Sequence, residues 1–348
     1  MKDKLISAIK LIVPLGFGVF LIWLFYDALC EDQKKDLFIA FKKANYFWVV
    51  LAMCFGLLSH MSRAWRWRYL LESMGHKVKY WNAYHAVMIG YIINYILPRA
   101  GEASRAGVLA QTEKVPFKKG FGSIIAERAV DVGMLGIICG IALLMQFDMI
   151  PAFQTKIESF TSGEFGCGNS SAFSILGNVV KYGIIIGFIG IVVISVASQN
   201  FRAKVVDFVK GVWEGAISIF KTDKKLLFIL HTIIIWVMYV AMFAVVFFSL
   251  DSTANLGVNA WLAGFIAGTI GLIIVQGGIG VYPAFVGLII TTYLNPDASG
   301  ILPDALALGW IIWASQTGMM IILGLISLMV NSKNVKLAKN ESASNTSE

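Results

Sequence analysis

Charged residues interrupt an apolar stretch of this sequence near residue 100. The stretch reads Asn94-Tyr-Ile-Leu-Pro-Arg-Ala-Gly-Glu-Ala-Ser-Arg105, and it carries Pro98, Arg99, Glu102 and Arg105 where hydropathy alone predicts a membrane span. Pro and Gly interrupt a helix and leave backbone N–H and C=O groups without partners. Inside a membrane this is tolerated only where other protein groups or a water-filled cavity supply the missing hydrogen bonds. The segment therefore predicts a polar site. An arginine fork can donate two hydrogen bonds to one phosphate, so phosphate binding is the chemistry that these residues favour.

A second charged group follows in the apolar run from residue 120 to residue 147. Glu127 lies seven residues after the start of this run, so a rise of about 1.5 Å per residue places it roughly 10 Å into the span. Glu127 and Asp131 are four residues apart and share a helix face, whereas Arg128 points about 100° away. Each such charge costs roughly 2.5 to 3.5 kcal/mol to insert, so the three side chains must be paired or hydrated.

These charged residues have two interpretations. In the first, Arg99 or Arg105 pairs with Glu127 or Asp131 and holds the fold together. In the second, Arg99 and Arg105 bind a lipid phosphate, while Glu102, Glu127 and Asp131 tune or counterbalance them. The two interpretations stay open together, because intramembrane ion pairs often serve both structure and a substrate path.

Other reactive residue types carry weaker signals. The run Arg63-Ala-Trp-Arg66-Trp-Arg68-Tyr predicts an interfacial anchor at the inner end of a span. The histidines at 60, 85 and 231 have no metal-ligand spacing, so we interpret them as packing residues and expect no metal and no cofactor. Cys30 and Cys167 both lie on segments expected at the outer face, where they could form a disulfide.

Composition places the chain among integral membrane proteins. Of its 348 residues, 57% are hydrophobic and only 14% are charged. We expect one membrane domain over residues 1–330 and a disordered cytoplasmic tail at 331–348. Apolar runs long enough to cross a roughly 30 Å hydrocarbon layer lie at Leu11–Leu29, Tyr46–Ser62, Gly120–Phe147, Phe173–Ser198, Leu226–Leu250 and Ala305–Val330.

The distribution of Lys and Arg predicts the orientation. Five segments, namely 1–10, 63–80, 98–119, 199–225 and 331–348, hold 22 of the 29 basic residues. The positive-inside rule puts these segments, and hence both termini, in the cytoplasm of a bacterial inner-membrane protein. The apolar run at 81–97 has basic segments on both sides, so it predicts a re-entrant hairpin from the inner face. The run at 260–294 has acidic flanks and predicts a hairpin from the outer face.

The two halves of the chain then share one plan. Half one, about 46–147, and half two, about 226–330, each consist of a span, a hairpin and a span in opposite orientations. At the hairpin tips, the segment 98–105 aligns without a gap on 277–284, which places Gly277, Gly278 and Gly280 opposite the charged break. Paired interrupted segments in two opposed halves indicate a transporter binding site near the midplane. The glycines could instead serve only close helix packing.

The expected fold class is therefore an all-α polytopic membrane protein with about six full spans. Two opposed re-entrant helical hairpins complete it, in an inverted pseudo-repeat.

These motifs together resemble a known family. The segment from Gly90 to Arg105, the later Glu127-Arg-Ala-Val-Asp131 and the glycine-rich element at 277–280 are similar to the signature of the lysylphosphatidylglycerol synthase membrane region. The resemblance covers about residues 5–330 and implies a flippase-like membrane protein. Full-length synthases add a cytosolic aminoacyl-transferase domain, which we do not expect here because only 18 residues follow Val330. Where many relatives carry an acidic residue, this chain reads Val281-Tyr-Pro283.

The sequence thus predicts translocation of an anionic lipid, either a phospholipid or a polyprenyl-phosphate-linked lipid. Asn94, Glu102, Arg105 and Arg128 belong to the expected headgroup site together with the residues named above. A membrane-embedded enzyme that acts on a lipid-phosphate headgroup and a lipid-binding partner subunit are the alternatives. No phosphate-binding loop is present in the sequence, so we do not expect ATP-driven pumping by this chain alone. We also expect no nucleic-acid partner. The oligomeric state stays open.

Overall fold

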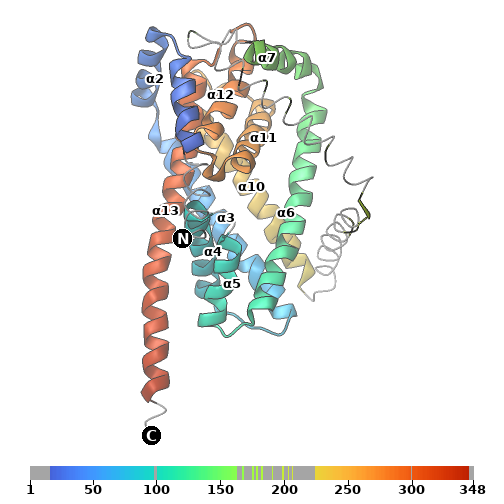
Figure 1. Cartoon of the computed structure of the whole chain (residues 1–348), viewed down its shortest axis with the longest axis vertical. Helices are drawn as coiled ribbons and strands as arrows, with labels where there is room; N and C mark the ends of the chain where they lie inside the picture. The colour runs from blue at the N-terminus through green and yellow to red at the C-terminus, as the bar shows by residue number, and fades with distance from the viewer. Residues whose placement is uncertain are drawn as a thin grey trace.

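Helices make up every regular element of the residues that the structure describes (Figure 1). The computed structural model describes residues 16–97, 100–162, 224–298 and 300–344, with single positions between 163 and 223. An apolar helix at Gly16–Asp27 comes first. The α-helices that follow are α2 Glu31–Lys43, α3 Tyr46–Ser73, α4 Tyr80–Ile96, α5 Gly101–Thr112, α6 Phe117–Met145, α7 Ile150–Ser162, α10 Lys225–Val245, α11 Val258–Ile274, α12 Val281–Leu294 and α13 Pro303–Ser344. Short 3-10 turns lie at Phe147–Met149, Val246–Ser249 and Gln276–Gly278.

Four of the described helices are long and apolar enough to cross a membrane. They are Tyr46–Ser73, Phe117–Met145, Lys225–Ser249 and Pro303–Ser332. Each confirms the position of a predicted span. The first predicted span corresponds to the shorter helix Gly16–Asp27, and the predicted span at 173–198 lies almost wholly outside the described residues. The structure therefore supports an all-helical membrane protein with fewer demonstrated spans than the six expected.

Two of these helices continue beyond their predicted ends. Helix α3 begins after Asn45, whose side chain accepts a hydrogen bond from the backbone N–H of Phe47 at 3.1 Å. It runs past Ser62 to Ser73, just before Gly75 takes a positive φ of 84°. Helix α13 runs to Ser344, through most of the segment that was expected to be a disordered tail.

The first interrupted region folds as a hairpin of two antiparallel helices, α4 and α5. The Asn82 side-chain amide, near the start of α4, donates to Glu113 Oε1 at 2.6 Å just after the end of α5. At the other end, the backbone N–H of Gly101 donates to Asn94 Oδ1 at 2.7 Å. That bond satisfies one of the free backbone donors at the start of α5.

The second interrupted region folds in the same way from α11 and α12. The side chain of Tyr282 in α12 packs against Gly268 of α11, and the Tyr282 backbone packs against Gly271, so the two helices run back along each other. Between them Gly277, Gly278 and Gly280 take positive φ angles of 71°, 67° and 75°. Such angles strain any residue with a Cβ atom, so the turn requires glycine at these positions.

The two halves of the described chain share one order of elements. Helix α3, the α4–α5 hairpin and α6 are followed later by α10, the α11–α12 hairpin and α13. Figure 1 shows α11 and α12 in the half of the molecule that contains α2 and α7, and α4 and α5 in the other half. The tips meet between them, because a Cβ atom on Gly277 would lie 3.2 Å from the Tyr95 ring.

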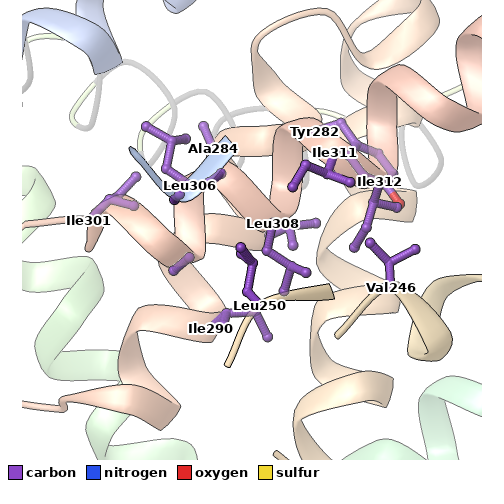
Figure 2. Packing of buried hydrophobic residues seen from close by; sticks show 14 of the residues in the cluster. Val246, Leu250, Tyr282, Ala284, Ile290, Ile301, Leu306, Leu308, Ile311 and Ile312 are labelled. Carbon is purple, nitrogen blue, oxygen red and sulfur yellow. The ribbon is translucent and has the colours of Figure 1, made fainter. Parts of the chain in front are cut away.

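Apolar packing fixes the second hairpin against α13 and α10. Figure 2 shows one buried cluster to which α12 contributes Tyr282 and Ile290, and α13 contributes Leu308 and Ile312. Val246, directly after α10, belongs to the same cluster. A second cluster lies around Trp67 and holds α3, α4, α5 and the start of α6 together. Because lipid tails are as apolar as these side chains, close van der Waals packing is the main source of stability here.

One covalent link joins two segments at the same end of the molecule. Cys30, which precedes α2, forms a disulfide with Cys167, which follows α7. The expected pairing is therefore confirmed. Figure 1 shows α2 and α7 at the end of the molecule where α12 also lies.

Candidate functional site

Five charged side chains from three helices meet in the interior. Arg63 Nη1 of α3 donates to Glu127 Oε1 at 2.9 Å and to Asp131 Oδ2 at 3.0 Å. Arg66 Nη2, also of α3, donates to the same Glu127 oxygen at 2.8 Å and to Asp131 Oδ1 at 2.9 Å. Arg105 Nη2 of α5 donates to Glu127 Oε2 at 2.8 Å. We call these five residues the ionic cluster.

Helical spacing explains why the ionic cluster assembles. Arg63 and Arg66 are three residues apart on α3, and Glu127 and Asp131 are four apart on α6, so each pair occupies one helix face. Where α3 and α6 pack, the two faces meet. Arg105 reaches Glu127 from α5, and its guanidinium lies 3.8 Å from the centre of the Trp67 ring.

The ionic cluster is buried and carries an excess of positive charge. Glu127 and Arg66 expose none of their surface, and Asp131, with 7% exposed, is the most accessible member. Three guanidinium groups face two carboxylates, which leaves one positive charge unbalanced. Neutral hydroxyls accept two of the remaining donors: Arg63 Nη2 donates to Tyr239 Oη and Arg66 Nη1 to Thr232 Oγ1, both at 3.2 Å.

The structure corrects the interpretation of the Arg63–Arg68 segment. Arg63 and Arg66 were expected to anchor the chain at the membrane interface, and this was wrong, since both side chains are buried in the ionic cluster. Arg68 is partly exposed instead: its guanidinium lies over the Trp65 ring, and its Nε donates to the Val78 carbonyl at 2.8 Å. The i, i+3 spacing of two arginines opposite an i, i+4 carboxylate pair was the signal that could have identified them.

The remaining predicted site residues divide between a small pocket and the second hairpin tip. The pocket beside the ionic cluster is lined by Val87, Gly90, Tyr91, Asn94, Gly101, Glu102, Arg105 and Arg128. Gly277, Gly278 and Gly280 do not line it, and the Trp313 side chain donates to the Gly277 carbonyl at 2.7 Å. Arg99 lies outside the described residues.

Arg128 differs from the other arginines of this region. Its side chain is 41% exposed, and its contact with Asp131 is long, at 3.5 Å. The other three guanidinium groups each hold a carboxylate at 3.0 Å or less. Arg128 therefore lines the pocket, and most of its guanidinium N–H groups do not donate to a carboxylate.

The pocket is small in this conformation. Its cavity volume of about 10 Å³ is enough for roughly one water molecule. A phosphate headgroup is larger, so the site must open before it can accept one. Gly101 keeps the two arms of the hairpin tightly together, because a Cβ atom there would lie 2.1 Å from the Gly90 carbonyl oxygen.

Two of the three predicted packing histidines have ordinary polar partners. His85 Nδ1 lies 3.0 Å from Ser327 Oγ, and His231 Nδ1 lies 2.8 Å from Ser62 Oγ. Among the described residues, no three metal-ligating side chains gather in one place. His60 is different, because neither of its ring nitrogens has a hydrogen-bond partner.

The long apolar helices define a polytopic helical membrane protein, and the ionic cluster lies buried among them. The chain belongs to the family of the lysylphosphatidylglycerol synthase TM region, whose model matches residues 11–324. The family resemblance of the sequence is thereby confirmed.

Two relatives are similar to parts of the chain. A UPF0104 membrane protein of Methanocaldococcus jannaschii is 29% identical over 93 residues, which cover 26% of this chain and 28% of that protein. The glycosyltransferase AglD of Haloferax volcanii is 27% identical over 158 residues, which cover 44% of this chain and 25% of that protein. The chain thus spans about a quarter of the length of these relatives. No solved structure matches the chain significantly.

Proposed function

We propose that this protein translocates an anionic, phosphate-bearing lipid across the inner membrane. The observation that carries the proposal is the unbalanced positive charge of the ionic cluster beside a pocket that Arg128 also lines. An uncompensated buried charge is costly, and a ligand anion offsets that cost. The headgroup would enter the pocket while the acyl tails remain in the bilayer.

In this proposal the residues divide their roles. Arg63, Arg66 and Arg105 are held by carboxylates, so they maintain the positive field and the shape of the site. Arg128 binds the phosphate, because its guanidinium is the one at the pocket that no short ion pair engages. Glu102 limits the charge of the empty pocket. Arg105, expected to hold the phosphate itself, acts mainly through Glu127.

The paired hairpins support a route through the membrane. The α4–α5 hairpin would enter from the cytoplasmic face and the α11–α12 hairpin from the outer face, as in transporters built from opposed halves. The Cys30–Cys167 disulfide supports this orientation, because disulfides persist in oxidising compartments outside the cytoplasm. Both termini would then be cytoplasmic, in agreement with the positive charge of the segments expected inside.

A liposome assay tests the function. The wild-type protein, reconstituted with labelled phosphatidylglycerol, should move the lipid between leaflets, and Arg128→Gln should slow this movement at least roughly tenfold, as expected when a charge-assisted contact of about 1.5 to 3 kcal/mol is lost. Lys118→Gln is the matched control, since it removes one exposed positive charge from the same helix. Wild-type rates in folded Arg128→Gln would refute the assigned role.

A second candidate is a membrane-embedded enzyme that acts on a polyprenyl-phosphate headgroup. The similarity to a glycosyltransferase favours it, although that match covers only a quarter of the relative. Such an enzyme would need Glu127 or Asp131 as a base, and each of these already accepts hydrogen bonds from two or more guanidinium groups. Mass analysis of lipid extracts separates the candidates, because an enzyme changes the mass of its lipid and a translocator changes only its sidedness.

A further inference from the structure

Glu102 lines the pocket without a partner in the part of the chain that the structure describes. Its carboxylate forms no ion pair and accepts no hydrogen bond there, although Arg128 lines the same pocket. Arg128 contacts Asp131 at 3.5 Å and does not pair with Glu102. A ligand that enters when the pocket opens therefore meets a hydrogen-bond acceptor and a hydrogen-bond donor that are not already bonded to each other.

Two helices place these opposite charges at one pocket. Glu102 is the second residue of α5, and Arg105 follows it three residues later on the same helix face. Arg105 also lines the pocket, but Glu127 holds its guanidinium at 2.8 Å. Among the residues that line the pocket, Glu102 from α5 and Arg128 from α6 are thus the charged groups without a short contact to an opposite charge.

A carboxylate at the start of a helix has a structural role of its own. Acidic side chains in the first turn stabilise a helix through its dipole, and Glu102 is the acidic residue in the first turn of α5. That role needs no pocket and gives no preference between lipids. A preference between lipid headgroups is therefore the property that distinguishes a binding role for Glu102 from a purely structural one.

The charge of a phosphate group depends on how many of its oxygens are esterified. A phosphodiester carries one negative charge at pH 7, whereas a phosphomonoester carries about 1.5 to 2. A carboxylate in the pocket repels the additional charge of the monoester. The same carboxylate accepts a hydrogen bond from a hydroxyl or ammonium group that lies next to the phosphate in a diester headgroup.

We infer that Glu102 is a specificity-determining residue, which selects phosphodiester lipids with a hydrogen-bond donor in the headgroup and rejects phosphomonoester lipids. The inference rests on the proposed function and names the class of its substrate. Arg128 binds the phosphate, and Glu102 accepts the hydrogen bond from the rest of the headgroup. Phosphatidylglycerol and a sugar-linked polyprenyl phosphate belong to the selected class. Phosphatidic acid and polyprenyl monophosphate belong to the rejected class.

Coulomb's law gives the size of the expected discrimination. Two unit charges about 8 Å apart at an effective dielectric constant of about 20 change an equilibrium by on the order of thirtyfold. A monoester carries only part of its second charge at pH 7, so we expect discrimination of roughly tenfold. Glu102→Gln removes the repulsion while the side chain keeps its shape and one acceptor oxygen.

A binding experiment tests the charge selection without any need for transport. Native mass spectrometry of the detergent-extracted protein, with equal amounts of phosphatidylglycerol and phosphatidic acid, gives the ratio of the two bound lipids. The wild-type protein should favour phosphatidylglycerol roughly tenfold, and Glu102→Gln should bring the ratio close to one. Glu113→Gln is the matched control, because Glu113 lies just after the same helix and does not line the pocket. Equal ratios in wild type and Glu102→Gln overturn the inference and leave the proposed function standing.

A second lipid pair tests the hydrogen bond to the headgroup. Phosphatidylmethanol is a phosphodiester with one negative charge, but its headgroup has no N–H or O–H group to donate. The wild-type protein should bind phosphatidylglycerol several-fold better than phosphatidylmethanol, and Glu102→Ala should remove this preference. Equal binding of the two lipids by the wild-type protein overturns the inference.

Liposome transport separates a failure of the inference from a failure of the function. The wild-type protein should move phosphatidylglycerol faster than phosphatidic acid by a factor similar to the binding ratio, and Glu102→Gln should move both at similar rates. If the wild-type protein moves neither lipid, the proposed function is refuted, and the two binding ratios still decide whether Glu102 selects the headgroup.

Discussion

Glu127 is the residue on which the interior charge arrangement depends most. It accepts hydrogen bonds from Arg63, Arg66 and Arg105, and it exposes none of its surface. Without its charge, Arg63 and Arg66 would keep only Asp131, and Arg105 would lose its carboxylate partner. Since a buried cation without a partner is strongly destabilising, the stability of the protein is tied to this carboxylate.

We therefore expect Glu127→Gln to lower the free energy of unfolding by about 3 to 5 kcal/mol. The measurement is unfolding in mixed micelles, followed by tryptophan fluorescence. Glu72→Gln is the matched control, because Glu72 pairs with the half-exposed Lys224 at 2.5 Å near the end of α3. Exposed pairs contribute only about 0 to 1 kcal/mol, so equal losses in the two variants would contradict the account.

At the residue scale, the sequence predicted the two carboxylates of the ionic cluster and missed Arg63 and Arg66. The depth of Glu127 and Asp131 follows from counting residues along an apolar run, and their need for partners follows from insertion cost. Arg63 and Arg66 lie in a segment rich in Trp and Arg, which is a pattern typical of the membrane interface. The i, i+3 spacing places both arginines on one helix face, but only the packing of α3 on α6 shows that this face is buried.

At the scale of elements, the α4–α5 hairpin depends on the close approach of two glycines. A Cβ atom on Gly101 would lie 2.1 Å from the Gly90 carbonyl oxygen, and 2.5 Å from the Asn94 side chain. Backbone atoms cannot move aside as easily as the end of a side chain. The geometry of the helix break, and with it the pocket, therefore requires glycine at this position.

The expected result for Gly101→Ala is a loss of about 1 to 3 kcal/mol in stability, together with slower lipid movement, because the hairpin must open to relieve the clash. Gly107→Ala is the matched control on the same helix, since a Cβ atom there meets nothing within 4 Å. That variant should gain about 0.4 to 1 kcal/mol. If both changes have the same sign in an unfolding titration, the packing argument fails.

Proline and glycine made the two hairpins predictable, whereas the helix ends were less so. The breaks near 98–101 and 275–280 coincide with residues that cannot continue a helix. The end of α3 was placed too early, because the arginines after Ser62 lower the hydropathy while their charges are paired inside the protein. The glycines of the second break were left open between two interpretations, and their positive φ angles and close contacts favour the structural one.

At the scale of the whole molecule, the two hairpins form the frame of the proposed function. Their tips meet where Gly277 contacts Tyr95, and the ionic cluster lies beside the first hairpin through Arg105. A translocator needs access from both faces to one polar site, and opposed hairpins provide that access in turn.

Cysteine labelling in intact cells tests this arrangement most directly. In a variant without reactive native cysteines, Lys79→Cys and Lys114→Cys flank the α4–α5 hairpin, and Asn255→Cys and Asp297→Cys flank the α11–α12 hairpin. The account predicts that a membrane-impermeant maleimide labels both members of the second pair from outside and both members of the first pair only after lysis. Labelling of Lys79→Cys and Lys114→Cys from opposite faces would contradict the central claim, because the chain would then cross the membrane between these two residues instead of returning to the face from which it entered.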